Sequence, residues 1–190
     1  MTMGEMARIW ERFEPPSGAR AEFIGGEIVI QANPTTLHNL IIRNLVRQVG
    51  GRTFEAWGEQ GLELHEDSRP RPDVMIVRGD DIPIESRDWP HQIVQAVVEV
   101  VSPGRDAWKD DWHKKRDAYQ EARIRRYLIV DPRDSSWHLL TLDFTASPPR
   151  YEEAAKGVFG QPVPVGIADE AGELVLDTVA WQPYPAKGPS

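Results

Sequence analysis

The stretch AVVEVVSP, residues 96–103, sets one acidic residue inside an otherwise apolar run. Alternation along a strand puts Glu99 on the same face as Val97 and Val101, and the opposite face is apolar throughout. Such a run is typical of a central strand that is covered on both sides. An ionised carboxylate there costs several kcal/mol unless a cation or hydrogen-bond donors satisfy it. A structural salt bridge, or a place near solvent where Ser102 and Pro103 stop the strand, is the alternative explanation.

A second acid has a similar setting in RPDVMIV, residues 71–77, where four apolar residues follow Asp73. Taken alone, it could form a Pro-Asp turn that pairs with Arg69 or Arg71. If the two runs are neighbouring strands, however, the two side chains can converge within a few ångströms. Two buried carboxylates repel each other, so one is protonated or a cation lies between them. Oxygen ligands without cysteine favour Mg²⁺ or Mn²⁺, and the pair therefore predicts a metal site.

The helix expected over residues 106–122 adds a cation. Lys115 lies in the middle of a stripe at helical spacing, whereas Lys114 lies about 100° away around the helix. We therefore predict that Lys115 points toward the sheet that carries Glu99, unless it reaches water along neighbouring aromatic rings. Asp111 lies one turn earlier and could pair with Lys115. The stripe consists of Trp108, Trp112, Lys115, Tyr119 and Ala122.

The rest of the chain supplies a sheet around these strands. A Gly-Gly pair predicts a β-hairpin over residues 21–31, and an amphipathic helix follows from about residue 33 to residue 51. Further strands are expected at residues 52–57, 61–66, 125–132 and 135–144, and short edge strands after residue 147. The order predicts a mixed α/β (α+β) domain, with a mixed central β-sheet flanked by helices and an N-terminal β-hairpin. We expect one domain over residues 1–182 and a disordered tail over residues 183–190.

Composition narrows the class of protein. The 190 residues include no cysteine, which excludes disulfides and cysteine-ligated zinc. No apolar run approaches the roughly 20 residues of a membrane helix, so we expect a cytoplasmic protein without a membrane partner. A formal net charge of −8 argues against a large nonspecific nucleic-acid surface. The segment from Arg105 to Arg126 nevertheless has more basic than acidic residues, which we interpret as a solvated helix face.

Taken together, GGEIV, His38, RPDV, VVEVVSP, the Lys115 helix and RRYLIVDP resemble the Uma2 family of putative restriction endonucleases, a branch of the PD-(D/E)XK nuclease superfamily. The resemblance covers about residues 22–144 and implies a restriction-endonuclease-like core. It implies that Asp73 and Glu99 bind the metal, together with the backbone carbonyl of Val100. Superfamily members usually place the lysine two residues after the second acid, where this chain has Val101.

The resemblance implies that the catalytic lysine lies on the following helix, at Lys115. It also makes His38 and Glu27 candidate supporting groups. A histidine that is simply satisfied within its helix and an exposed glutamate are the alternative explanations for these two residues.

Two function hypotheses follow. The first is a Mg²⁺-dependent endonuclease that hydrolyses phosphodiester bonds of nucleic acid, with DNA as the expected partner, through a metal-activated water. The second is a nuclease-like fold that acts as a binding or assembly module with little or no catalysis, which the acidic charge and the displaced lysine favour. A two-carboxylate glycoside hydrolase has less support, because no other feature indicates a sugar-binding cleft. A homodimer is also expected, since a small acidic nuclease often needs a second subunit to embrace a duplex.

Overall fold

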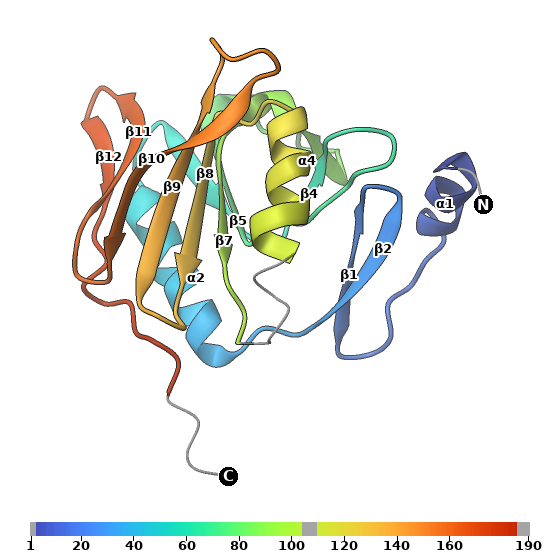
Figure 1. Ribbon diagram of the computed structural model, residues 1–190, viewed down its shortest axis with the longest axis horizontal. Coiled ribbons are helices and arrows are strands. Elements are labelled where there is room, and N and C mark those ends of the chain that lie inside the picture. The colour runs from blue at the N-terminus through green and yellow to red at the C-terminus, as the bar shows by residue number, and fades with distance from the viewer. Residues whose placement is uncertain (1–2, 104–109, 186–190) are drawn as a thin grey trace.

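A six-stranded mixed sheet forms the centre of the structure, a computed structural model that describes residues 3–103 and 110–185 (Figure 1). Its strands lie in the order β10-β9-β8-β7-β5-β3. Only β7 and β8 are parallel, and the other neighbours in this sheet are antiparallel. The strands are β3 (Phe54–Trp57), β5 (Val74–Arg78), β7 (Val94–Val100), β8 (Arg126–Asp131), β9 (Ser136–Asp143) and β10 (Arg150–Val158).

Helices cover both faces of this sheet, as the two apolar faces of residues 96–101 predict. Helix α2 (Thr36–Val49) packs Ile41, Leu45 and Val49 against one face, and α4 (Arg116–Glu121) lies on the other (Figure 1). The two faces of β7 thereby enter two separate apolar clusters. The α4 helix belongs to the crossover that a parallel pair requires between β7 and β8. It follows η3 (Asp110–Lys115), a π-helical turn.

The β-hairpin of β1 (Ala19–Ile24) and β2 (Glu27–Ala32) stands beside the sheet. Gly25 and Gly26 form its turn with φ of 57° and 77°, values that a side chain disfavours. Backbone hydrogen bonds between Phe23 and Arg69 connect the hairpin to the loop before β5. An N-terminal helix, α1 (Met3–Trp10), contacts the hairpin through the stacked rings of Trp10 and Phe23.

Smaller elements complete the fold. Strands β4 (Gly61–Glu63) and β6 (Asp88–Pro90) form a short parallel pair, and β11 (Val163–Asp169) and β12 (Gly172–Leu176) form an antiparallel pair. Two single 3₁₀ turns, η1 (Gly79–Asp81) and η2 (His91–Ile93), flank β6. Among the described residues, no helix has the length and apolarity needed to cross a membrane.

The mixed sheet, its flanking helices and the N-terminal hairpin confirm the predicted fold class. Several element predictions need correction. The chain has a helix at α1 that was not predicted, and β10 is a nine-residue strand of the main sheet rather than a short fragment. Near the end of the described residues, Tyr184 donates its backbone N–H to the Pro132 carbonyl and its hydroxyl to the Val101 carbonyl, at 2.8 and 3.0 Å.

Candidate active site

Glu99 and Lys115 form a buried ion pair beneath the α4 helix. Lys115 Nζ lies 3.0 Å from Glu99 Oε1 and 3.2 Å from Glu22 Oε1, and the three residues are 1–2% exposed. The Tyr119 hydroxyl donates a second hydrogen bond to Glu99 Oε1, at 2.8 Å. Burial and the negative charge of Glu99 raise the pKa of Tyr119 well above its ordinary value of 10.0, so the phenol keeps its proton as a donor.

Glu22 is the second acid that contacts the Lys115 ammonium. Its Oε1 also accepts the Arg71 backbone N–H at 2.9 Å, and its Oε2 accepts the Gln31 side chain at 3.0 Å. These two hydrogen bonds fix the Glu22 carboxylate. The Lys115 ammonium is therefore shared by two oriented acids, one on the hairpin and one on the central sheet.

Asp73 lies at the start of β5 with a different set of donors. Its Oδ2 lies 3.0 Å from His38 Nε2 and accepts the Val100 backbone N–H at 2.8 Å, while Oδ1 lies 4.0 Å from Arg20 Nη2. Burial would raise the pKa of Asp73, but the hydrogen bond and charge of His38, the charge of Lys115 and the Val100 N–H together hold it below the ordinary 3.8. An ionised carboxylate only accepts, so Nε2 of His38 carries the proton.

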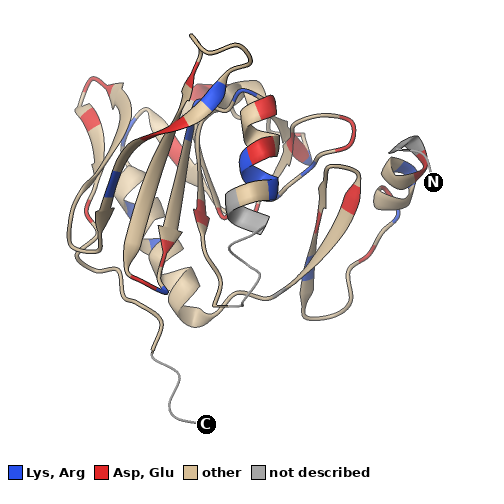
Figure 2. Cartoon of the chain, in the orientation of Figure 1, with Lys and Arg blue, Asp and Glu red and all other residues tan. Residues whose placement is uncertain are grey.

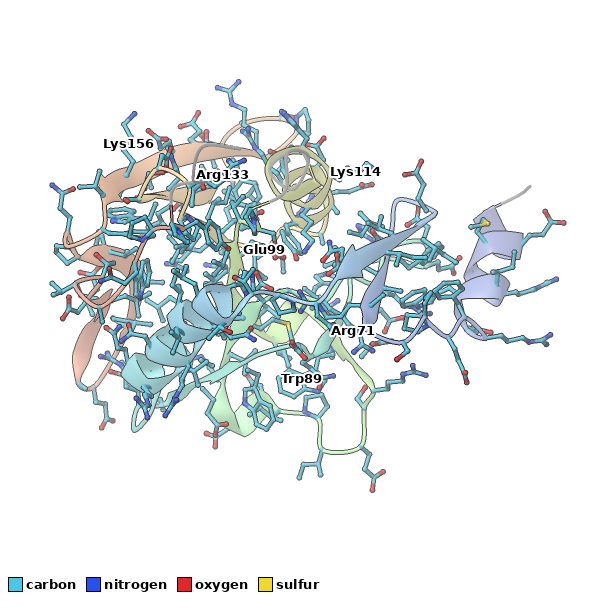
Figure 3. The ribbon with its side chains drawn as sticks, turned by 90° about the horizontal axis from the view of Figure 1, so that it is seen from below. Arg71, Trp89, Glu99, Lys114, Arg133 and Lys156 are labelled. Atoms are coloured by element: carbon cyan, nitrogen blue, oxygen red, sulfur yellow. The ribbon has the colours of Figure 1, made fainter. Side chains whose placement is uncertain are left out.

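The strand register brings the two predicted acids to the same place. Val74 of β5 pairs with Val98 of β7 in an antiparallel ladder, so the preceding Asp73 lies opposite Glu99. The Asp73 carboxylate contacts the Val100 backbone and His38 of α2, whereas the Glu99 carboxylate contacts Lys115 and Tyr119 on the α4 side. The charge of Lys115 also acts on Asp73, which places all three groups in one electrostatic neighbourhood. Seen from below in Figure 3, Glu99 lies near the centre of the molecule.

The donor set suits a hard cation, although it does not enclose one. Within the described ranges, no group of three or more Asp, Glu, His or Cys side chains is close enough to hold a metal ion. Mg²⁺, however, usually keeps several waters and binds through one or two carboxylates. Two buried carboxylates, those of Glu22 and Glu99, share the single ammonium of Lys115, so one negative charge of this group remains to attract a divalent ion. The Val100 carbonyl faces the same side as its N–H, toward Asp73.

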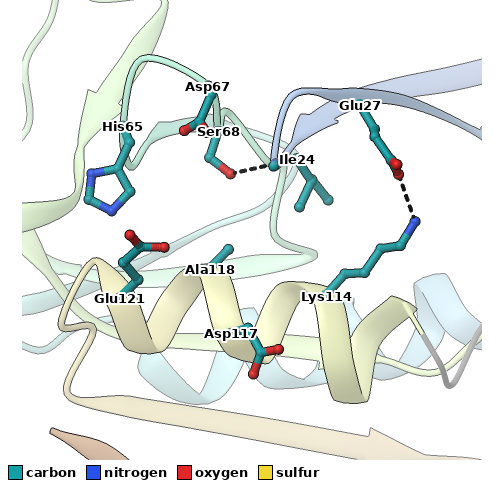
Figure 4. A pocket seen from close by; sticks show the side chains of 10 residues that line it. Ile24, Glu27, His65, Asp67, Ser68, Lys114, Asp117, Ala118 and Glu121 are labelled. Carbon is teal, nitrogen blue, oxygen red and sulfur yellow. Dashed lines mark hydrogen bonds and ion pairs between the residues drawn. The ribbon is translucent and has the colours of Figure 1, made fainter. Parts of the chain in front are cut away.

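The structure separates Glu27 from these groups. Glu27 is exposed and pairs with Lys114 at 3.0 Å, beside a pocket of about 320 Å³ on the outer side of α4 (Figure 4). Lys114 therefore points away from Glu99, as the helical spacing predicts. The side chain of Asp111 and those of Trp108 and Trp112 lie outside the described residues.

Sequence reasoning missed three residues of this cluster: Glu22, Arg20 and the donor role of Tyr119. Glu22 gives the same signal as Glu99, because it is an acid within the buried run of β1. His38 was left between two explanations, and its contact with Asp73 places it in the cluster. The sequence does not indicate that Arg20 lies near Asp73, because this proximity depends on how the hairpin packs against the rest of the fold.

Comparisons with known proteins agree with this architecture. The family model described as "Uma2: Putative restriction endonuclease" matches residues 8–166. A solved structure from Anabaena variabilis, described as a putative nuclease belonging to DUF820, superimposes with a TM-score of 0.61. The match covers 87% of this chain and 89% of that chain at 18% identity, which shows a shared fold. No curated protein matches the sequence. Because the family model spans most of the chain, this protein belongs to the Uma2 family.

Proposed function

We propose that this protein is a metal-dependent endonuclease that hydrolyses phosphodiester bonds of nucleic acid. The observation that carries the proposal is the convergence of Asp73, Glu99 and Lys115, with the amine 3.0 Å from one of two opposed acids. The family description, restriction endonuclease, makes DNA the expected substrate. A homodimer remains a prediction, which size-exclusion chromatography with light scattering can test.

Asp73 and Glu99 would hold Mg²⁺ or Mn²⁺, together with the Val100 carbonyl. When bound, such an ion neutralises charge on the phosphodiester and lowers the pKa of a coordinated water. His38 orients Asp73 through Oδ2, which leaves Oδ1 directed toward Arg20. A carboxylate fixed in this way loses little conformational entropy when it binds a ligand.

Lys115 would supply a positive charge next to the reacting phosphate or its attacking water. An ammonium has three donors, of which two point to Glu22 and Glu99 here. Glu22 therefore acts as the positioning residue that keeps the amine beside Glu99. A lysine on the crossover helix can fulfil this role as well as one on the strand, because catalysis depends on where the amine lies.

One observation favours the second candidate, a nuclease-like binding or assembly module. The Lys115 ammonium is already shared by two glutamates, and all three groups are almost completely buried. A closed arrangement of this kind also stabilises a fold without any turnover. The two candidates differ in whether the site binds a divalent ion.

Calorimetric titration with Mn²⁺ and Mg²⁺ tests the proposal. The wild type should bind at least one ion, and Glu99→Gln and Asp73→Asn should weaken binding at least about tenfold and abolish cleavage of plasmid DNA. Glu27→Gln is the matched control, because it removes an exposed carboxylate outside the cluster. It should bind and cleave like the wild type. A folded wild type that binds neither ion contradicts the endonuclease and supports the binding module.

A further inference from the structure

A second pocket lies at the opposite end of the elements that carry the candidate active site. Its volume is about 580 Å³, and its lining includes Arg78, Arg123 and Arg125 but no acidic residue. In a chain with a net charge of −8, three arginines around one acid-free hollow form a strongly localised positive charge. The basic segment that the sequence suggested to be a solvated helix face contributes two of them.

None of these three arginines has a carboxylate partner within the described part of the chain. Two of them contact aromatic rings instead: the Arg78 guanidinium lies 5.8 Å from the Phe54 ring centroid, and that of Arg125 lies 5.6 Å from the Phe144 centroid. A cation–π contact with a ring uses no N–H donor in an ion pair, so the guanidinium N–H groups stay available to a ligand. The rings therefore orient these donors without neutralising them.

Arg123 occupies a backbone position that normally belongs to glycine. It follows the C-cap of α4 with φ of 59°. Its N–H donates to the Gln120 carbonyl and the next N–H, of Ile124, donates to the Tyr119 carbonyl, both at 3.0 Å. This is the Schellman pattern, in which the residue with positive φ is usually glycine. A charged side chain kept in a strained conformation at a pocket indicates a function for that side chain.

The pocket and the candidate active site share three elements. Strand β7 passes from Val94 in the pocket to Glu99, β5 leads from the residue after Asp73 to Arg78, and the η3–α4 helix leads from Lys115 toward Arg123. The seven residues of β7 span about 20 Å at about 3.3 Å per residue. The arginines are therefore too far from Glu99 to serve the same reacting group.

We infer that this pocket, lined by Arg78, Arg123 and Arg125, is a binding site for phosphate groups. Arginine N–H edges match phosphate oxygens in bidentate geometry. The phosphate can belong to a nucleic-acid backbone or to a small phosphorylated molecule. The inference does not rest on the proposed endonuclease, because it concerns different residues and predicts binding rather than cleavage.

Two probes distinguish these sources: pyrophosphate, followed by calorimetry, and a fluorescein-labelled DNA duplex of about 20 base pairs, followed by anisotropy in EDTA. Arg123→Gly and the double variant Arg78→Gln/Arg125→Gln should weaken binding of at least one probe about fivefold or more. Arg43→Ala is the control, since it removes an exposed arginine of α2 that is not in the pocket. It should change binding less than twofold.

Arg123→Gly also separates a ligand site from a structural role. Glycine relieves the positive φ, so this variant should melt at or above the wild-type temperature while it binds less well. Weakening for pyrophosphate indicates a small phosphorylated ligand, and weakening for DNA alone indicates a backbone phosphate. The inference is overturned if the wild type binds neither probe, or if Arg43→Ala weakens binding as much as the pocket variants do.

Discussion

Lys115 is the cation that two buried glutamates share, and its removal has a calculable effect. Lys115→Met leaves Glu22 and Glu99 facing each other without compensation. Breaking a buried ion pair in this way costs about 3–5 kcal/mol of unfolding free energy. Urea denaturation at neutral pH measures this change.

Two comparisons make this prediction specific. Lys114→Met removes an exposed lysine from the same helix and should change the unfolding free energy by less than about 0.5 kcal/mol. The double variant Lys115→Met/Glu99→Gln should recover part of the loss, because it removes one of the two unpaired charges. Equal effects for Lys114→Met and Lys115→Met would show that the buried pair does not stabilise the fold.

Asp73 makes the stability of the protein depend on acidity. Its folded pKa lies below the ordinary 3.8, so the unfolded chain binds the proton more readily. The stabilisation is complete well above pH 3.8 and is lost as the pH falls through 3.8 and then through the lower folded value. Asp73→Asn should therefore flatten the acid side of a plot of unfolding free energy against pH.

The control for Asp73→Asn is Asp80→Asn, which changes an exposed carboxylate in η1. The unfolding free energy of this variant should fall with decreasing pH in the same way as that of the wild type. If the unfolding free energies of the wild type and of Asp73→Asn fall equally steeply at acid pH, Asp73 is not preferentially ionised in the folded state.

Residue-scale reasoning located the acids by one physical signal, a charge within a buried run. That signal identified Asp73 and Glu99, and helical spacing correctly chose Lys115 over Lys114. Glu22 gives the same signal, but the family resemblance implied Glu27 as a supporting acid instead. Most partners of these acids could not be predicted, because they come from distant segments of the chain, as for Glu22 and Lys115.

At the scale of elements, the start of α2 connects helix stability to the candidate active site. Thr35 is the N-cap, and its hydroxyl accepts the backbone N–H of His38 at 3.3 Å. Thr35→Ala should lower the unfolding free energy by about 1 kcal/mol, because the first turn loses its cap. Because the capped residue is His38, the imidazole that contacts Asp73 should also become more mobile.

Urea denaturation measures the first effect, and NMR linewidths of the His38 ring measure the second. Thr35→Ser is the control, since it keeps the hydroxyl and should stay close to the wild type. A His38 ring that is equally ordered in Thr35→Ala would show that Asp73 alone holds the imidazole.

The elements themselves were predicted where local patterns are strong. The helical stripe is confirmed from Lys115 through Tyr119 to Ala122, which are all buried. The π-helical turn at η3 was not predicted, since single-turn π-helices lack a distinctive sequence pattern. The length of strand β10 was predicted too short, because its residues are mostly exposed and lack a strong apolar pattern. This exposure is typical of a strand at the edge of a sheet.

At the scale of the whole molecule, the sheet order predicts how stability is distributed. Strands β7 and β8 are central and covered on both faces, whereas α1 contacts the hairpin at the periphery (Figure 1). In hydrogen exchange followed by mass spectrometry, amides of β7 and β8 should exchange slowest, through global unfolding. Those of α1 should exchange by local opening, orders of magnitude faster. Protection of α1 equal to that of β7 would contradict this distribution.

The order of strands in the sheet lay beyond the sequence patterns. Periodicity shows that two runs are buried, but it does not show which strands are neighbours or that β8 runs parallel to β7. The distribution of charge is similarly a property of the assembled chain. Figure 2 shows basic residues midway along the η3–α4 helix and acidic ones toward its upper end, an asymmetry that net charge does not reveal.

Lys115 lies on the helical connection between β7 and β8, whereas Glu99 lies on β7 itself. Mutations during evolution can therefore move one of these residues without disturbing the other. One residue inserted within η3, before Lys115, would shift the amine by about 100° around the helix and withdraw it, while every strand keeps its partner. The buried contact between Lys115 and Glu99 can therefore be lost or gained through a single insertion or deletion in the crossover helix. The main sheet would keep its strand order and pairing after such an insertion or deletion.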